Sequence, residues 1–223
     1  MSESVGLVFL FDVDNTLLDN DRVHDGLGAH IERVFGAFGR DRYWAIYEDL
    51  RKQLGYADYL GAMQKFRLEC DDNPHALELA AFLLDYPFPE CLYPRALEAV
   101  RDLARLGTTV VLSDGDAVLQ PRKIAVSGIA DAVEGRQLIY VHKETMLDDV
   151  ERRYPAKHYV MVEDKLRVLD AIKQHWRERV TTVFVRQGHY ADDPKSLAEY
   201  PPAQWMLDGV GDLVGRGIGD FLF

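Results

Sequence analysis

One short stretch near the N-terminus limits the folds open to this chain more than any other. The five apolar residues from Leu7 to Phe11 are followed by Asp12 and Asp14, one residue apart, and by Asn15 and Thr16. The run is too short and too aromatic for a helix, so it predicts a buried strand that ends in a polar turn. Alternate residues of a strand share a face, so both aspartates can point into one site. Carboxylates that close together repel each other unless a cation lies between them.

Beyond residue 90, short apolar runs alternate with helical patterns. The runs cover residues 108–112, 137–141, 158–162 and 180–185, with a weaker one at 205–207. This alternation predicts parallel strands, right-handed crossovers and helices on both faces of the sheet. We therefore expect an α/β fold with a Rossmann-like parallel sheet. In such sheets the ligand binds at the carboxyl ends of the strands.

The segment between the first two predicted strands has a different pattern. From residue 19 to about residue 90, apolar residues recur at helical spacing and no run has strand character. Gly39 is placed to end the first of four helices, and Asn73-Pro74 is placed to open the last. Two prolines, at 87 and 89, cannot continue a helix and so end the segment. We expect a small all-helical unit over 19–90, inserted after the first strand of a core formed by 1–18 and 91–223.

Polar side chains follow four of the predicted strands. The residues at these ends are Asp12 and Asp14, then Ser113 and Asp114, then Lys143, then Glu163 and Asp164. The carboxyl ends of parallel strands meet at one edge of a sheet, so acids, a hydroxyl and an amine should converge there. Taken singly, Ser113 and Asp164 could simply cap helices, and Lys143 could be a solvated surface lysine. Their joint placement favours a functional site.

Taken in order, these residues resemble the four motifs of the haloacid dehalogenase (HAD) superfamily, whose members are mostly Mg-dependent phosphatases and phosphotransferases. Asp12-Val-Asp-Asn-Thr16 matches the first motif and Glu163-Asp164 the fourth, with Ser113 and Lys143 as the second and third. The resemblance runs from Leu7 to about Val185. The helical segment is similar to the C1-type cap of phosphatase-type members.

The resemblance implies catalytic roles for three residues. Asp12 would be the nucleophile that forms an aspartyl-phosphate, and Asp14 would protonate the leaving oxygen and then deprotonate the attacking water. Lys143 would compensate the charge of the phosphate and restrain Asp12. The residues that would bind the substrate are Thr16, Ser113, Asp114 and Lys143.

The resemblance also implies a Mg²⁺ site, because Mg²⁺ prefers oxygen ligands and usually takes one or two carboxylates. Its ligands would be Asp12, the backbone carbonyl of Asp14, and Asp164, with Glu163 as a direct or indirect partner. The fourth motif departs from the common pattern, because Val168 stands where many members carry a further acid. The division of labour between Glu163 and Asp164 therefore stays open.

The function that fits best is a Mg-dependent phosphatase of a small phosphorylated metabolite, with the helical cap excluding water. A haloacid dehalogenase-like activity is an alternative, although that branch of the superfamily lacks the second aspartate of the first motif, here Asp14. A phosphomutase and a non-catalytic HAD-fold binding protein also stay open. The sequence does not identify the substrate.

Composition narrows the partners and the compartment. The net charge is −11 and the basic residues form no stripe, which argues against nucleic acid as a partner. The N-terminal apolar run has no basic start and leads into aspartates, so we expect neither a signal peptide nor a membrane span. Cys70 and Cys91 lack metal-site spacing and fit a reducing cytoplasm. A homodimer stays open.

Overall fold

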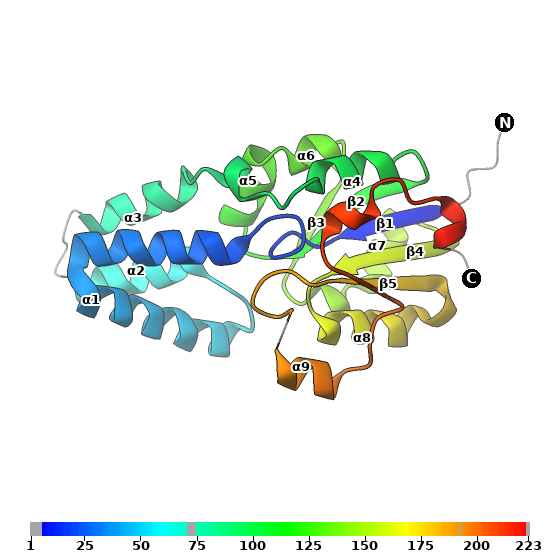
Figure 1. Cartoon of the computed structure of the whole chain (residues 1–223). Coiled ribbons are helices and arrows are strands. Elements are labelled where there is room, and N and C mark those ends of the chain that lie inside the picture. The colour runs from blue at the N-terminus through cyan, green and yellow to red at the C-terminus, as the bar shows by residue number, and fades with distance from the viewer. Residues whose placement is uncertain (1–5, 71–74, 192, 222–223) are drawn as a thin grey trace.

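A computed structural model of the chain describes residues 6–70, 75–191 and 193–221 (Figure 1). Within these residues, six parallel strands form one sheet in the order β3-β2-β1-β4-β5-β6. The strands are β1 (Leu7–Phe11), β2 (Thr108–Asp114), β3 (Gln137–Tyr140), β4 (His158–Glu163), β5 (Val180–Val185) and β6 (Trp205–Leu207). The predicted α/β fold with a parallel sheet is confirmed.

Helices cover both faces of this sheet, because alternate residues of the central strand enter two separate apolar clusters. Phe9 and Phe11 of β1 pack into the cluster that contains Ile124, whereas Val8 and Leu10 pack into the other. The helices on the first face are α4 (Ala96–Leu103), α5 (Leu119–Val126) and α6 (Ile129–Ala132), and those on the second are α7 (Leu147–Arg153) and α8 (Leu166–Trp176). A strand buried on both faces reads as a continuous apolar run, as β1 does.

Short helical elements complete the described chain. They are α9 (Pro194–Glu199), which contacts α8, and the 3-10 turns η1 (Phe88–Cys91), η2 (Lys143–Thr145), η3 (Arg177–Arg179), η4 (Val210–Leu213) and η5 (Ile218–Asp220). None of the helices in the described ranges combines the length and the apolar character that a membrane crossing requires.

Three helices follow β1 and extend away from the sheet (Figure 1). They are α1 (Asn20–Leu54), α2 (Tyr59–Glu69) and α3 (His75–Leu84), and we call them the helical cap. The side chain of Asp19 caps α1 by accepting a 2.9 Å hydrogen bond from the backbone N of Arg22. The division of the chain at residues 18 and 90 remains a prediction.

The prediction that Gly39 ends the first cap helix is wrong. The span labelled α1 comprises two helices that meet at Gly36, three residues before Gly39, where the backbone has φ 74° and ψ 175°. Glycine reaches this positive φ at little steric cost, so the chain kinks there. Gly39 lies buried in the next helical turn. The expected opening of the last cap helix at Asn73-Pro74 lies outside the described residues.

Two Phe→Ala variants test the position of the core. Phe9 is fully buried in β1 and its ring meets Phe221 edge-on at 5.3 Å, whereas Phe38 on α1 is 85% exposed. We expect Phe9→Ala to lower the free energy of unfolding by about 3 to 5 kcal/mol through the cavity it leaves. Phe38→Ala should change it by less than about 0.5 kcal/mol. Urea denaturation measures both, and similar values for the two variants would contradict this packing.

Candidate active site

Two of the three predicted catalytic residues, Asp12 and Lys143, form a buried ion pair. The backbone N of Asp12 donates to the carbonyl of Val162 at 3.0 Å, so this residue extends the β1–β4 pairing. The Nζ of Lys143 lies 2.5 Å from Asp12 Oδ1 and 2.6 Å from Glu163 Oε2, and all three side chains are almost fully buried. Burial lowers the pKa of Lys143, but these two carboxylates outweigh it and raise the pKa above its ordinary value. Lys143 is therefore a protonated, buried amine that holds one oxygen of Asp12.

Three buried carboxylates gather beside this lysine. Oxygen atoms of Asp12, Glu163 and Asp164 lie within 4.8 Å of one another. Among the described residues, Asp12 Oδ2 and both carboxylate oxygens of Asp164 have no hydrogen-bond partner, although Asp164 Oδ1 lies 3.9 Å from Lys165 Nζ. Burial raises the pKa of Asp164 well above its ordinary value; Lys165 opposes this change, whereas the carboxylates of Glu163 and Asp12 add to it. Buried acids with so few partners are unfavourable unless a further cation lies among them.

Hard divalent cations fit this donor set, because they bind carboxylate oxygens. Glu163 is already occupied, since it pairs with Lys143 and its Oε1 accepts a 3.2 Å hydrogen bond from the backbone N of Lys165. The free oxygens belong to Asp12 and Asp164, which favours them as direct ligands. The simpler explanation of Asp164 as a helix cap does not hold, because Lys165 stands at the N-cap of α8 and that cap has no side-chain hydrogen bond.

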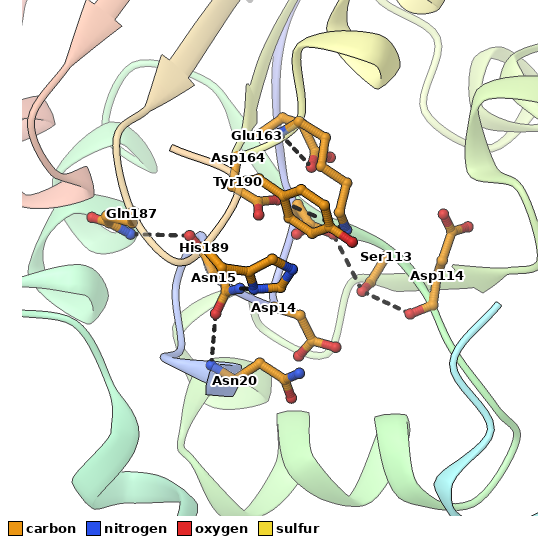
Figure 2. A network of polar contacts seen from close by, with 12 residues as sticks. Asp14, Asn15, Asn20, Ser113, Asp114, Glu163, Asp164, Gln187, His189 and Tyr190 are labelled. Atoms are coloured by element: carbon orange, nitrogen blue, oxygen red, sulfur yellow. Dashed lines mark hydrogen bonds and ion pairs between the residues drawn. The ribbon is translucent and has the colours of Figure 1, made fainter. Parts of the chain in front are cut away.

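Ser113 and Asp114, at the end of β2, support the same site. The Oγ of Ser113 lies 3.5 Å from Asp12 Oδ1 and accepts a 2.9 Å hydrogen bond from Gln120 Nε2. Asp114 Oδ1 accepts from the backbone N of Lys143 at 2.7 Å, so it anchors the loop that carries the lysine. Burial raises the pKa of Asp114, although Lys143 opposes this change. Figure 2 shows Ser113 and Asp114 in one network with Asp14 and the fourth-motif acids.

The second aspartate of the first motif has a partner that sequence reasoning missed. Lys123 on α5 places its Nζ 2.6 Å from Asp14 Oδ1 and is only 1% exposed. Lys123 and Ile124 are buried in this helix, whereas Ala125 and Val126 are exposed. The helical spacing could have indicated the burial of Lys123, because this residue follows the buried Leu119 by one helical turn.

Thr16 lies apart from the cavity, although it was predicted to bind substrate. Its side chain is fully buried, and its Oγ1 has no hydrogen-bond partner among the described residues. The main-chain carbonyls of this turn accept hydrogen bonds from the side chain of Gln187. Its Nε2 lies 2.7 Å from the carbonyl oxygen of Thr16 and 3.3 Å from that of Asn15. Asn15 has a positive φ of 61°, and its Oδ1 accepts from the backbone N of Asn20 at 2.9 Å (Figure 2).

The loop after β5 also reaches the site. His189 contacts Asp21 on α1 twice, through Nδ1 at 2.6 Å and through its backbone N at 2.7 Å. Burial raises the pKa of Asp21, but hydrogen bonds from Asn15 and His189 outweigh it and lower the pKa below its ordinary value. Gly188 has φ 67°, and a Cβ there would lie 2.4 Å from the side chain of Asn15, so the loop requires glycine. Sequence reasoning left His189 outside the site.

A cavity of about 880 Å³ joins these groups to the cap. Core residues on its wall include Asp12, Asp14, Ser113 and Lys143, and cap residues on its wall include Tyr47, Arg51, Tyr56 and Tyr59. His142 and His189 also line it. A volume of this size suits a small molecule. Asp12, Lys143 and Asp14 therefore line one cavity of small-molecule size.

The sequence matches the haloacid dehalogenase-like hydrolase family over residues 7–175. The chain therefore belongs to this family of hydrolases, as its motifs predicted. Its structure is similar to that of a haloacid dehalogenase-like hydrolase from Burkholderia xenovorans LB400, with 58% sequence identity and a TM-score of 0.91. That similarity covers 95% of this chain and 99% of the Burkholderia chain.

More distant structures share the fold. L-2-haloacid dehalogenase from Xanthobacter autotrophicus is 16% identical with a TM-score of 0.62, and the HAD-hydrolase YfnB from Bacillus subtilis, bound to magnesium, is 14% identical with a TM-score of 0.63. Each similarity covers 92% of this chain and 96% of the other. At these identities the likeness shows the fold alone. No curated protein matches the sequence.

The buried carboxylate of Asp164 affects the free energy of unfolding of the metal-free protein. Because burial raises its pKa, the folded protein is stabilised by this group at pH values below the unfolded pKa, and that contribution is lost as pH rises through the folded pKa. At neutral pH in EDTA, Asp164→Asn should therefore raise the free energy of unfolding by about 1 to 3 kcal/mol.

Urea denaturation across pH measures this effect, and the gain should vanish at acidic pH, where Asp164 is protonated. Asp148→Asn is the matched control, because that side chain is 96% exposed. It should change stability by less than about 0.5 kcal/mol. A loss of stability in Asp164→Asn at neutral pH would show that the carboxylate is compensated.

Proposed function

We propose that this protein is a Mg²⁺-dependent phosphatase of small phosphorylated metabolites that acts through an aspartyl-phosphate. The observation that carries the proposal is the difference between the surroundings of the two carboxylate oxygens of Asp12. One of its oxygens is held by Lys143, and the other has no hydrogen-bond partner among the described residues and belongs to a buried acidic cluster. A nucleophile needs one free oxygen, a fixed orientation and nearby positive charge, and Asp12 has all three.

The reaction divides into two transfers. In the first, a carboxylate oxygen of Asp12 attacks phosphorus, the bond to the ester oxygen breaks, and Asp14 donates a proton to that oxygen. In the second, Asp14 takes a proton from water, the water oxygen attacks phosphorus, and the bond to Asp12 breaks to release phosphate. Lys143 and Ser113 stabilise the charge on the transferring group through Nζ and Oγ.

The buried acids fit a metal ion in this scheme. Asp12, the backbone carbonyl of Asp14, and Asp164 would hold Mg²⁺, and Glu163 would act through its contact with Lys143. When bound, the ion supplies the positive charge that lets a phosphate approach three carboxylates.

Several features support a phosphate ester over an organic halide. A halide leaves without a proton, whereas an alkoxide needs one, and Asp14 on the cavity wall can supply it.

The cavity and the net charge of −11 support a small soluble substrate. We place the enzyme in the cytoplasm, with neither nucleic acid nor membrane as a partner.

Asp12→Asn tests the nucleophile. We expect Mg²⁺-dependent hydrolysis of p-nitrophenyl phosphate by the native protein, no hydrolysis in EDTA, and a loss of more than about 1,000-fold in kcat for Asp12→Asn. The exposed Asp148→Asn serves as the matched control and should keep its activity. Chloride release from 2-chloropropionate with no phosphatase activity would instead favour dehalogenation.

Ion binding can be measured without turnover. Mg²⁺ should raise the Tm of the native protein, because a ligand that binds only the folded state stabilises it by RT ln(1 + [L]/Kd). Asp164→Asn removes a charged ligand whose two oxygens are free and should lose most of this increase. An equal increase in the two proteins would place the ion elsewhere.

A further inference from the structure

Lys123 is a buried lysine with two partners on different parts of the molecule. Its Nζ lies 2.6 Å from Asp14 Oδ1 and 2.9 Å from Asn20 Oδ1. Asp14 belongs to the turn after β1, whereas Asn20 is the first residue of the cap helix α1. A side chain of α5 therefore joins the acid–base candidate to the cap.

The contact with Asp14 fixes one of its two oxygens. A buried ammonium is unfavourable without a close acceptor, so Lys123 holds Oδ1 firmly, and its own side chain is only 1% exposed. Asp14 is 26% exposed and lines the cavity, which leaves Oδ2 as the oxygen that can meet a leaving group or a water. Acid–base catalysis requires this kind of fixed geometry within hydrogen-bond reach.

The contact with Asn20 continues into the cap. Asn20 Nδ2 donates to the hydroxyl of Tyr59 on α2 at 3.2 Å, and the hydroxyl of Tyr43 donates to the carbonyl of Tyr59 at 3.1 Å. Tyr43 and Tyr59 are buried in the cap interior. The position of Nζ, and with it that of Asp14, thus depends on how the first turn of the cap is seated.

We propose that Lys123 is a positioning residue that orients the carboxylate of Asp14 for proton transfer and does so only while the cap is seated on the core. This inference rests on the proposed phosphatase function. Lys123 lies on the cavity wall, but the described contacts of its Nζ are to Asp14 and Asn20 and not to Asp12 or the acidic cluster, so we assign its effect to Asp14.

The test compares substrates that differ in their need for a proton. In kcat/KM, Lys123→Met should lower hydrolysis of an alkyl phosphate such as glycerol phosphate by about 10- to 100-fold, and hydrolysis of p-nitrophenyl phosphate by less than about 5-fold, because nitrophenolate leaves without a proton. Lys123→Arg keeps the cation and should recover part of the alkyl phosphate activity. Asn20→Leu keeps Lys123 but removes its contact to the cap, together with the hydrogen bond from Asn20 to Tyr59, and should show the same split to a smaller extent.

Two comparisons separate this role from a merely structural one. Arg122→Met is the matched control for loss of a core–cap contact, because Arg122 is the neighbour on α5, contacts Leu84 and Asp85 at the end of cap helix α3, and has no described contact with Asp14. It should leave both activities within about 2-fold. In an Asp14→Asn background, Lys123→Met should cost less than about 2-fold further, because the group it positions is already gone.

The outcomes are distinct. Equal losses for both substrates, full additivity with Asp14→Asn, or an equal loss in Arg122→Met would overturn the role of Lys123 while leaving the phosphatase assignment intact. A native protein that hydrolyses no phosphate monoester in Mg²⁺ would overturn the proposed function, and the inference with it.

Discussion

The ion pair between Asp12 and Lys143 is the interaction on which the site depends. Both side chains are buried, and the same amine also contacts Glu163. Lys143 and Lys165, the latter 3.9 Å from Asp164, do not balance three converging carboxylates, so the site carries a surplus of negative charge. That surplus suits a cation, while Lys143 contacts one oxygen of Asp12 and the other has no hydrogen-bond partner among the described residues.

The sheet makes this convergence possible. Residues more than a hundred positions apart meet because β1, β2 and β4 are adjacent and parallel, with their carboxyl ends at one edge. The cap supplies the opposite wall of the cavity. The proposed chemistry and the proposed substrate contacts would thus come from different parts of the chain, and Lys123 and the His189 loop are among the contacts that join them.

The strands and the motif residues could be predicted from the sequence because their signals are local. An apolar run followed by acids marks a buried strand end, and parallel topology then brings such ends together. The break at Gly36, the burial of Lys123 and the contact of His189 with Asp21 could not be predicted in this way. Each is set by tertiary packing: a helix kink, a helix face and a loop position that no local pattern encodes.

Trapping the covalent intermediate tests the central claim most directly. The protein would be acid-quenched during turnover of p-nitrophenyl phosphate with Mg²⁺, reduced with borohydride, which converts an aspartyl-phosphate to homoserine, and digested for mass spectrometry. The account predicts homoserine at Asp12 and at no other aspartate. Turnover without any modified residue, or modification at Asp14 or Asp164 in place of Asp12, would contradict it.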